Sequence, residues 1–194
     1  MSLVKEAVER EDLARRDADS GLSRPGILLR DAIHRANKII YQTARTQSHC
    51  EGMGTTVVAG LFFDDRLTIA HVGDSRLYRL RGEELAQVTQ DHSLMNELVS
   101  RGFYTPQEAQ RASAKNYVTR ALGVEPTVEV DIAEVPVQKE DLFLLCSDGL
   151  SDMVALDSIS MPAGMEPDQV VTVLQDFAFD SGAHDNISVI YIET

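Results

Sequence analysis

Residues 54–81, GTTVVAGLFFDDRLTIAHVGDSRLYRLR, decide the fold of this 194-residue chain. Three short runs within this stretch, residues 55–63, 66–73 and 76–81, alternate in polarity or are rich in β-branched residues. The turn-forming pair DD and the triplet GDS separate these runs. Short runs of this kind between turns predict β-strands. The stretch therefore predicts a meander of antiparallel strands, which a turn at Gly82 extends into ELAQVT.

The pattern on the N-terminal side of this stretch is helical. Residues 1–20 are dense in charge and alanine and predict a first helix. Ser23 and Pro25 then mark the start of a second helix, since a hydroxyl cap followed by proline is typical of helix N-termini. Helical spacing continues through residues 27–45 at four apolar positions: Leu29, Ile33, Ala36 and Ile40.

The C-terminal side mixes helices and strands. Residues 91–117 break the strand pattern and predict a helical insertion packed over the sheet, with Asp91 as a cap and Thr105 and Glu108 at capping-box spacing. Further strands are predicted at 127–135, 141–149 and 186–193, and a helix at 166–179. Because no repeat or long linker divides the chain, we expect one domain over residues 1–194, with the insertion at 91–117 inside it.

Charge and composition restrict the classes of partner. Against 18 Lys and Arg the chain carries 31 Asp and Glu, which gives a net charge of −13. Such a field repels phosphate backbones and anionic lipid, so nucleic acid and membrane surfaces are not expected partners. Without an apolar run of about 20 residues or the apolar core of a signal peptide, we expect a cytoplasmic protein. Cys50 and Cys146 are interpreted as buried thiols.

Three aspartates stand directly beside predicted strands. Asp74 lies in HVGDSR, Asp148 in LFLLCSDGL and Asp185 in GAHDNISVIYI. Strand ends hold side chains rigidly, so the three carboxylates could share one cleft, where their mutual repulsion would favour a cation. All-oxygen ligands suit Mg²⁺ or Mn²⁺. The alternative is that these are ordinary turns, because Gly-Asp, Asp-Gly and Asp-Asn are common turn pairs.

The chain resembles a known family at five motifs, which occur in the family's order and approximate spacing. They are GMGTTVVA, AHVGDSRLYRLR, VTRALG, LLCSDGLSDMV and HDNISVIYI, starting at residues 52, 70, 118, 144 and 184. The family is that of the metal-dependent protein phosphatases, the type 2C serine/threonine phosphatases, and the resemblance is strongest to its bacterial branch. In that branch the region equivalent to 91–117 is a mobile flap beside the active site.

The resemblance implies a fold and a set of metal ligands. The fold is α+β, a four-layer α-β-β-α sandwich of two antiparallel sheets flanked by helices, here lacking the family's first strands. Asp148 and Asp185 would be ligands of the catalytic metal pair, Mn²⁺ or Mg²⁺, and Asp74 would join Asp148 at a third, weaker metal. In the family a water between two metals attacks a phosphoserine or phosphothreonine monoester. Arg76 would have a mainly structural role.

Two family motifs have no counterpart in residues 1–49. These are the RxxNED-like strand that supplies a phosphate-binding arginine and the DGMGG strand whose aspartate bridges the metals. Glu51 in EGMGTT does not replace that aspartate, because it follows the helix at 27–45 and directly precedes a strand. We interpret Glu51 as a loop residue, and the chain as beginning downstream of DGMGG.

Two functions follow as expectations. The first is a protein serine/threonine phosphatase domain whose 194 residues alone have little or no activity. The second is a non-catalytic pseudophosphatase that binds a partner or phosphoprotein. The expected partners are a phosphoprotein substrate and a cognate Ser/Thr kinase pathway. A homodimer or strand exchange would cover sheet edges left open by missing strands.

Overall fold

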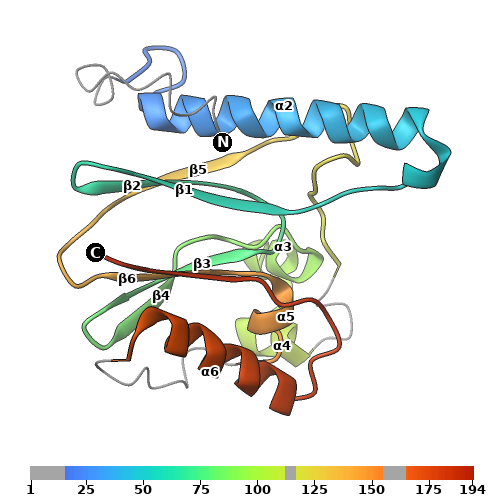
Figure 1. Ribbon diagram of the computed structural model, residues 1–194. Helices are drawn as coiled ribbons and strands as arrows, with labels where there is room; N and C mark the ends of the chain where they lie inside the picture. The colour runs from blue at the N-terminus through green and yellow to red at the C-terminus, as the bar shows by residue number, and fades with distance from the viewer. Residues whose placement is uncertain (1–15, 112–116, 155–164) are drawn as a thin grey trace. The chain divides into compact units, whose positions relative to one another are not determined.

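The structure is a computed structural model that describes residues 16–111, 117–154 and 165–194. The chain forms two compact units, which are described separately. Unit 1 comprises residues 1–72 and 120–137, and unit 2 comprises residues 73–119 and 138–194. Each unit contains one antiparallel sheet with helices beside it (Figure 1). The predicted α+β fold with two antiparallel sheets flanked by helices is confirmed.

Unit 1 is a three-stranded sheet with one long helix along a face. The strands have the order β1-β2-β5, and Val57 at the start of β1 lies opposite Val72 at the end of β2. Figure 1 shows helix α2 running along this sheet. The elements are α2 (Arg24–Thr46), the 3-10 helix η2 (Ser48–Cys50), β1 (Val57–Phe63), β2 (Arg66–Val72) and β5 (Asp131–Pro136).

Helix α2 begins where the sequence predicts it. The Ser23 side chain accepts a hydrogen bond from the Gly26 N–H, and Pro25 occupies the first turn, where its missing N–H costs nothing. The apolar stripe of the helix then packs on the sheet. The resulting core contains Ile33, Ala70, Val72 and Leu122, with Leu29, Ala36, Ile40, Val57, Val128, Val130 and Ile132 against it.

A buried asparagine on α2 fastens the loop that leads into β5. Asn37 is only 1% exposed, and its Oδ1 accepts from the Gly123 N–H at 2.8 Å. Its Nδ2 donates to the carbonyls of Glu125 at 3.1 Å and Pro126 at 3.3 Å. A buried amide with all these partners costs little, whereas its removal would leave backbone groups unpaired.

The segment before α2 is a turn where a helix was predicted. Residues 1–15 lie outside the described residues, but residues 16–20 form a bridge and a turn. The Asp17 carboxylate accepts from the Ser20 N–H at 2.8 Å and from its hydroxyl at 2.7 Å. Such side-chain bonds to nearby backbone compete with helix formation, so the predicted helix does not extend to residue 20.

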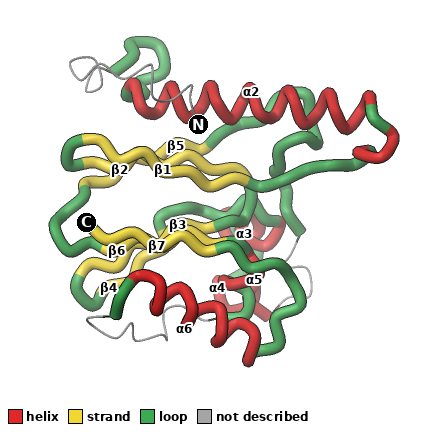
Figure 2. The backbone as a smooth tube through the Cα atoms, viewed as in Figure 1, coloured by secondary structure: helices red, strands yellow, loops and turns green. Residues whose placement is uncertain are grey.

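Unit 2 is a four-stranded antiparallel sheet covered on one face by a helix. The strand order is β4-β3-β6-β7, and the tube in Figure 2 shows α6 beside these strands. The elements are β3 (Arg76–Arg81), β4 (Glu84–Gln87), α3 (Leu94–Ser100), α4 (Pro106–Arg111), β6 (Leu142–Cys146), α5 (Asp148–Ser151), α6 (Pro167–Asp180) and β7 (Val189–Glu193). The core residues are Tyr78, Leu144, Cys146, Leu150, Val154, Val170, Leu174 and Ala178.

Both cysteines are free thiols. Cys146 is buried in β6, whereas Cys50 is half-buried. Burial raises the pKa of the Cys146 thiol to about 12, so this thiol stays protonated at neutral pH. It therefore acts as a small apolar core residue.

Several strands are shorter than predicted. β6 ends at Cys146 and not at residue 149, because Asp148 begins helix α5, and β5 and β7 start later than predicted because they lose a partner. β5 starts at Asp131 and not at residue 127, because its neighbour β2 ends at Val72 and the last paired residues are His71 and Asp131. β7 starts at Val189 and not at residue 186, because the Ser188 N–H donates to the Ser147 side chain. In both cases the ladder ends where a backbone partner is lost.

Helices α3 and α4 lie within the predicted insertion at 91–117, of which residues 112–116 are outside the described part. The Thr105–Glu108 capping box is confirmed: the Thr105 N–H donates to the Glu108 carboxylate at 2.8 Å, and the Glu108 N–H donates to the Thr105 hydroxyl at 3.3 Å. Among the described residues, no helix is long and apolar enough to cross a membrane.

Replacing Asn37 by alanine tests the clamp, by which we mean the hydrogen bonds from Asn37 to the loop before β5. We expect Asn37→Ala to lower the free energy of unfolding by about 2–3 kcal/mol, because it leaves the Gly123 N–H unpaired and opens a small cavity. Urea denaturation followed by circular dichroism measures the change. The control is Gln42→Ala on the exposed side of α2, which should stay within about 0.5 kcal/mol. Equal effects of the two substitutions would refute the clamp.

Candidate metal centre

The strand register of unit 2 brings three chain segments to one end of the sheet. Cys146 at the end of β6 lies opposite Arg76 at the start of β3 and Val189 at the start of β7. Asp74 precedes β3, Asp148 follows β6 and Asp185 precedes β7. The three predicted metal ligands therefore belong to segments at the same end of three neighbouring strands, with Asp148 as the first residue of α5.

Ser147 joins the loop of Asp148 to the loop of Asp185. Its hydroxyl donates to the Asn186 carbonyl at 3.2 Å and accepts from the Ser188 N–H at 3.0 Å. Its own N–H donates to the Ser188 carbonyl at 3.1 Å. Three hydrogen bonds thus hold the SDG and DNIS segments side by side.

Gly149 allows these two segments to approach each other closely. A Cβ atom at this position would lie 2.4 Å from the Asn186 carbonyl oxygen, a distance that atoms cannot adopt without a backbone shift. The glycine of SDG is therefore required by packing, since any side chain would push the Asp185 loop away.

The two carboxylates of these loops are oriented in the same way. Asp148 Oδ1 accepts from the Gly149 N–H at 2.9 Å, and Asp185 Oδ1 accepts from the Asn186 N–H at 2.7 Å. Each bond is to the next residue and fixes the side chain against its own backbone. Asp148 is half-buried and Asp185 is exposed, so the pair lies at the surface of the unit.

The pKa of Asp74 is affected by other carboxylates. Burial raises the pKa of Asp74, and the negative charge of Asp148 raises it further, with smaller contributions from Asp91 and Asp152. A bound cation would relieve this repulsion and keep Asp74 ionised. The donor set is entirely oxygen, which fits a hard divalent ion such as Mg²⁺ or Mn²⁺.

The backbone of the Asp74 loop is fixed by His92. Gly73 has a φ of 110°, which favours glycine, and its N–H donates to His92 Nδ1 at 3.0 Å. The His92 N–H donates back to the Gly73 carbonyl at 2.9 Å. This reciprocal pair ties the GDS turn to the start of the helical insertion.

Arg76 has the structural role that the resemblance implies. Its Nε donates to both Asp91 carboxylate oxygens at 3.0 Å, and its Nη2 donates to Asp91 Oδ2 at 2.6 Å. Burial alone would lower the pKa of Arg76, but the bonds to Asp91 outweigh it and the pKa rises. The guanidinium is therefore a fixed cation beside the Asp74 loop.

Asp91 is consequently not the helix cap that was predicted. Its carboxylate is taken up by Arg76 and by Gln87, whose Nε2 donates to it at 2.9 Å. Ser93 caps α3 in its place, and its side chain accepts from the Asn96 N–H at 3.3 Å.

Glu51 lies outside unit 2, in unit 1. It is exposed and ends the 3-10 helix η2, in a turn that leads toward β1. This position agrees with its interpretation as a loop residue.

Comparison with known proteins identifies the family. The family model described as Protein phosphatase 2C matches residues 2–176. The chain belongs to the protein phosphatase 2C family. The predicted resemblance to its bacterial branch is confirmed by relatives from bacteria.

Two curated phosphatase 2C relatives illustrate the likeness. The serine/threonine phosphatase stp of Listeria monocytogenes is 40% identical over 167 residues, which are 85% of this chain and 66% of that protein. The protein phosphatase PhpP of Streptococcus pneumoniae is 36% identical over 79% of this chain and 63% of its own length. The chain thus spans slightly less than two thirds of the length of these relatives.

Solved phosphatase 2C structures agree. Serine/threonine phosphatase Stp1 from Staphylococcus aureus has a TM-score of 0.79 and 31% identity, over 91% of this chain and 72% of that one. The catalytic domain of the serine/threonine protein phosphatase PstP, solved in complex with two manganese ions, has a TM-score of 0.75 and 36% identity, over 93% and 76% of the two chains.

The sequence did not indicate the hydrogen-bond partners of several residues around this candidate site. Ser147 and His92 are the main examples, because their partners are 41 and 19 residues away in the chain. The available signals were the place of Ser147 in the LLCSDGLSDMV motif and the place of His92 directly after Asp91. Asp152 was likewise missed, although it lies one helical turn after Asp148 and acts on the pKa of Asp74.

Substitution of Ser147 tests whether the link between the two loops orients the carboxylates. We expect Ser147→Ala to weaken Mn²⁺ binding about tenfold, because the residues that position metal ligands commonly contribute this much. Isothermal titration calorimetry measures the affinity.

The matched control is Ser151→Ala, one turn further along. The Ser151 Oγ is buried and has no hydrogen-bond partner in the described structure, so its loss should leave Mn²⁺ affinity unchanged. If Ser147→Ala binds Mn²⁺ as the unsubstituted chain does, the link has no role in the site.

Proposed function

We propose that this chain is the metal-binding part of a protein serine/threonine phosphatase that hydrolyses phosphoserine and phosphothreonine. The observation that carries the proposal is the convergence of Asp74, Asp148 and Asp185 at one end of a single sheet. Three carboxylates on adjacent strand ends offer the oxygen ligands that hard divalent cations prefer.

Asp148 and Asp185 would hold the catalytic metals, and Asp74 with Asp148 would hold a further, weaker one. When bound, Mn²⁺ or Mg²⁺ lowers the pKa of a water and offsets negative charge on the phosphoryl oxygens. The chain's own residues orient the ligands: Ser147 and Gly149 keep the loops of Asp148 and Asp185 together. His92 and Arg76 fix the segment on either side of Asp74.

The protein residues also govern the charge balance. Asp74 is half-buried and near Asp148, and both features raise the pKa of Asp74, so a cation close by would favour its ionised form. Arg76 is already paired with Asp91 and does not neutralise Asp74. The site is thereby left with a net negative charge that suits divalent metal.

A second candidate is a pseudophosphatase that binds phosphoproteins without hydrolysing them. Residues 1–194 contain no counterpart to the phosphate-binding arginine motif or to DGMGG, so these residues alone would lack both groups. Losing a positioned charge of this kind commonly costs about 10²–10³ in rate. We therefore propose little or no hydrolysis by these 194 residues alone.

Metal titration of paired variants tests the proposal. We expect Asp148→Asn and Asp185→Asn each to weaken Mn²⁺ binding at least about tenfold, because each removes a charged ligand. The control is Asp168→Asn, an exposed carboxylate in the first turn of α6. Mn²⁺ affinity unchanged in both site variants, or lowered equally in the control, would remove Asp148 and Asp185 from the site.

Hydrolysis and association are measured on the same samples. With Mn²⁺ and a phosphothreonine peptide, release of phosphate above the level of Asp148→Asn supports the enzyme, whereas peptide binding without release supports the pseudophosphatase.

We also propose a cytoplasmic location, a role in a Ser/Thr kinase pathway, and a homodimer or strand exchange at sheet edges. Phe62 on β1 and Ile190 on β7 are exposed on edge strands, and sedimentation at micromolar concentration would detect the dimer.

A further inference from the structure

Helix α2 carries a concentration of positive charge that contrasts with the rest of the chain. Its 23 residues contain five basic side chains and one acidic side chain, although the whole chain has 31 Asp and Glu and a net charge of −13. The basic residues are Arg24, Arg30, Arg35, Lys38 and Arg45, and the acidic one is Asp31.

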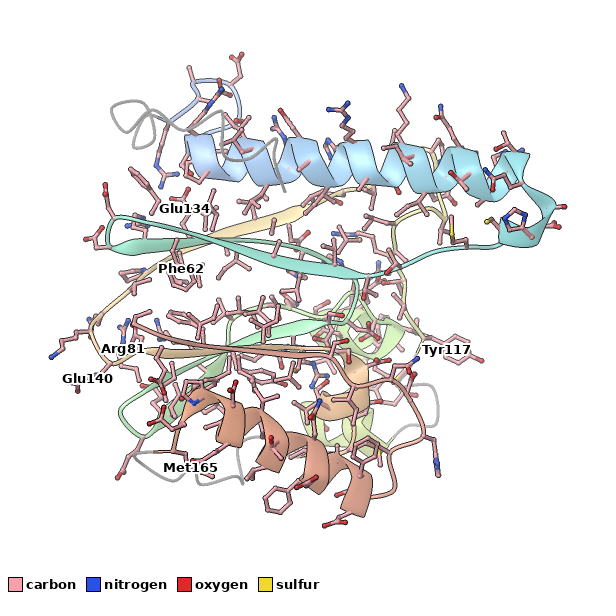
Figure 3. All side chains as sticks on the ribbon, in the orientation of Figure 1. Phe62, Arg81, Tyr117, Glu134, Glu140 and Met165 are labelled. Atoms are coloured by element: carbon pink, nitrogen blue, oxygen red, sulfur yellow. The ribbon has the colours of Figure 1, made fainter. Side chains whose placement is uncertain are left out.

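Four of these basic residues share the exposed side of the helix. Arg24, Arg35, Lys38 and Arg45 are all exposed, and we call them the basic face. At 100° per residue they fall in a sector of about 80° opposite Ile33, which packs on the sheet. In Figure 3, side chains that end in nitrogen stand along the side of α2 away from the sheet of unit 1.

The charge of the basic face is not neutralised within the described part of the chain. Asp31, the acidic residue of α2, accepts from the neighbouring Arg30 at 3.1 Å. Among residues 16–111, 117–154 and 165–194, no carboxylate pairs with Arg35, Lys38 or Arg45. The Arg45 guanidinium lies over the Tyr41 ring at 5.5 Å, which fixes it without removing its charge.

Arg45 in the last turn suits the helix dipole, but the other positions of the basic face do not favour the helix. Arg24 stands in the first turn, which contains no acidic residue, so its charge opposes the positive end of the helix dipole. Arg35 and Lys38 are like charges at i, i+3 spacing, which destabilises a helix slightly. A solvated surface normally mixes both signs, so solubility alone does not account for a one-sign face in an acidic protein.

The dimensions of the basic face define what it can bind. From Arg24 to Arg45 the helix rises about 31 Å, which an extended peptide of about nine or ten residues would span. The positive charges are spread along this length and do not converge on one point, as a clamp for a single phosphate would. Distributed carboxylates therefore match the face better than one phosphate group does.

The net charge of the protein selects against larger anionic partners. A membrane or a duplex nucleic acid would meet the field of the whole chain, which is strongly negative. A short segment that lies along α2 would feel mainly the local positive charge, since screening acts over about 8 Å at physiological salt. We propose that the basic face of α2 docks an acidic, Asp- and Glu-rich segment of a protein partner.

Peptide binding to a matched pair of double variants tests this docking surface. The probe is a fluorescein-labelled twelve-residue peptide of alternating Glu and Ala, measured by fluorescence anisotropy at 50 mM and 150 mM salt. We expect the unsubstituted chain to bind it, with weaker binding at the higher salt. Arg35→Gln/Lys38→Gln should weaken binding about fivefold or more, because two exposed charge pairs are lost.

The control variant, Arg101→Gln/Lys139→Gln, removes the same charge from exposed positions off α2 and should leave binding unchanged. Circular dichroism confirms that both variants keep their helix content, as glutamine is a good helix former. If both double variants lost the same amount of peptide affinity, binding would depend on the net charge of the chain and not on the basic face, which would overturn the proposal. Binding to phosphatidylserine vesicles but not to the peptide would overturn it as well, as would no peptide binding at 50 mM salt.

Discussion

The backbone pairing of β6 with β3 on one side and β7 on the other is the constraint on which the candidate metal centre depends. Because Cys146 lies opposite both Arg76 and Val189, the chain before β3, after β6 and before β7 emerges at one end of the sheet. A shift of one residue in either pairing would turn every side chain of that strand to the other face. The apolar side chains of β6 oppose such a shift, since Phe143, Leu144, Leu145 and Cys146 are all buried.

Holding several carboxylates together is unfavourable without a cation, and unit 2 contains specific interactions that resist their separation. Ser147 bonds to the backbone on both sides of Ile187, and Gly149 lets that backbone approach closely. His92 and Gly73 are joined by two hydrogen bonds on one side of Asp74. On its other side, Arg76 is paired with Asp91. The candidate site is thus pre-organised by backbone contacts and by one ion pair, and a divalent cation would balance the charge of its carboxylates.

The sequence predicted the main elements of the fold because their signals are local. Ser23 and Pro25 at the start of α2, and Thr105 with Glu108 before α4, form the caps that their spacing indicates. Alternating and β-branched runs predicted the strands, and the motifs around Asp74, Asp148 and Asp185 predicted which residues to examine. Their common location at one sheet end follows from the strand order, which the sequence alone did not give.

The misses arose where a distant partner overrode a local preference. Asp91 has the residue type and the position of a helix cap, but its carboxylate accepts hydrogen bonds from Arg76, 15 residues away. Asp17 turns the chain before α2 by bonding Ser20, where charge and alanine content predicted a helix. The first paired residue of β5 and the partners of Ser147 cannot be predicted from the local sequence. Both depend on where a neighbouring strand or loop ends.

Paramagnetic broadening by Mn²⁺ tests the metal centre most directly. In a ¹H–¹⁵N spectrum of the labelled chain, sub-stoichiometric Mn²⁺ should first remove the amide signals of Ser75, Gly149 and Asn186, which adjoin the three carboxylates. Excess Mg²⁺ should restore them by competition. If those signals keep their intensity while amides along exposed acidic stretches such as the first turn of α6 broaden, the three aspartates do not form a metal site.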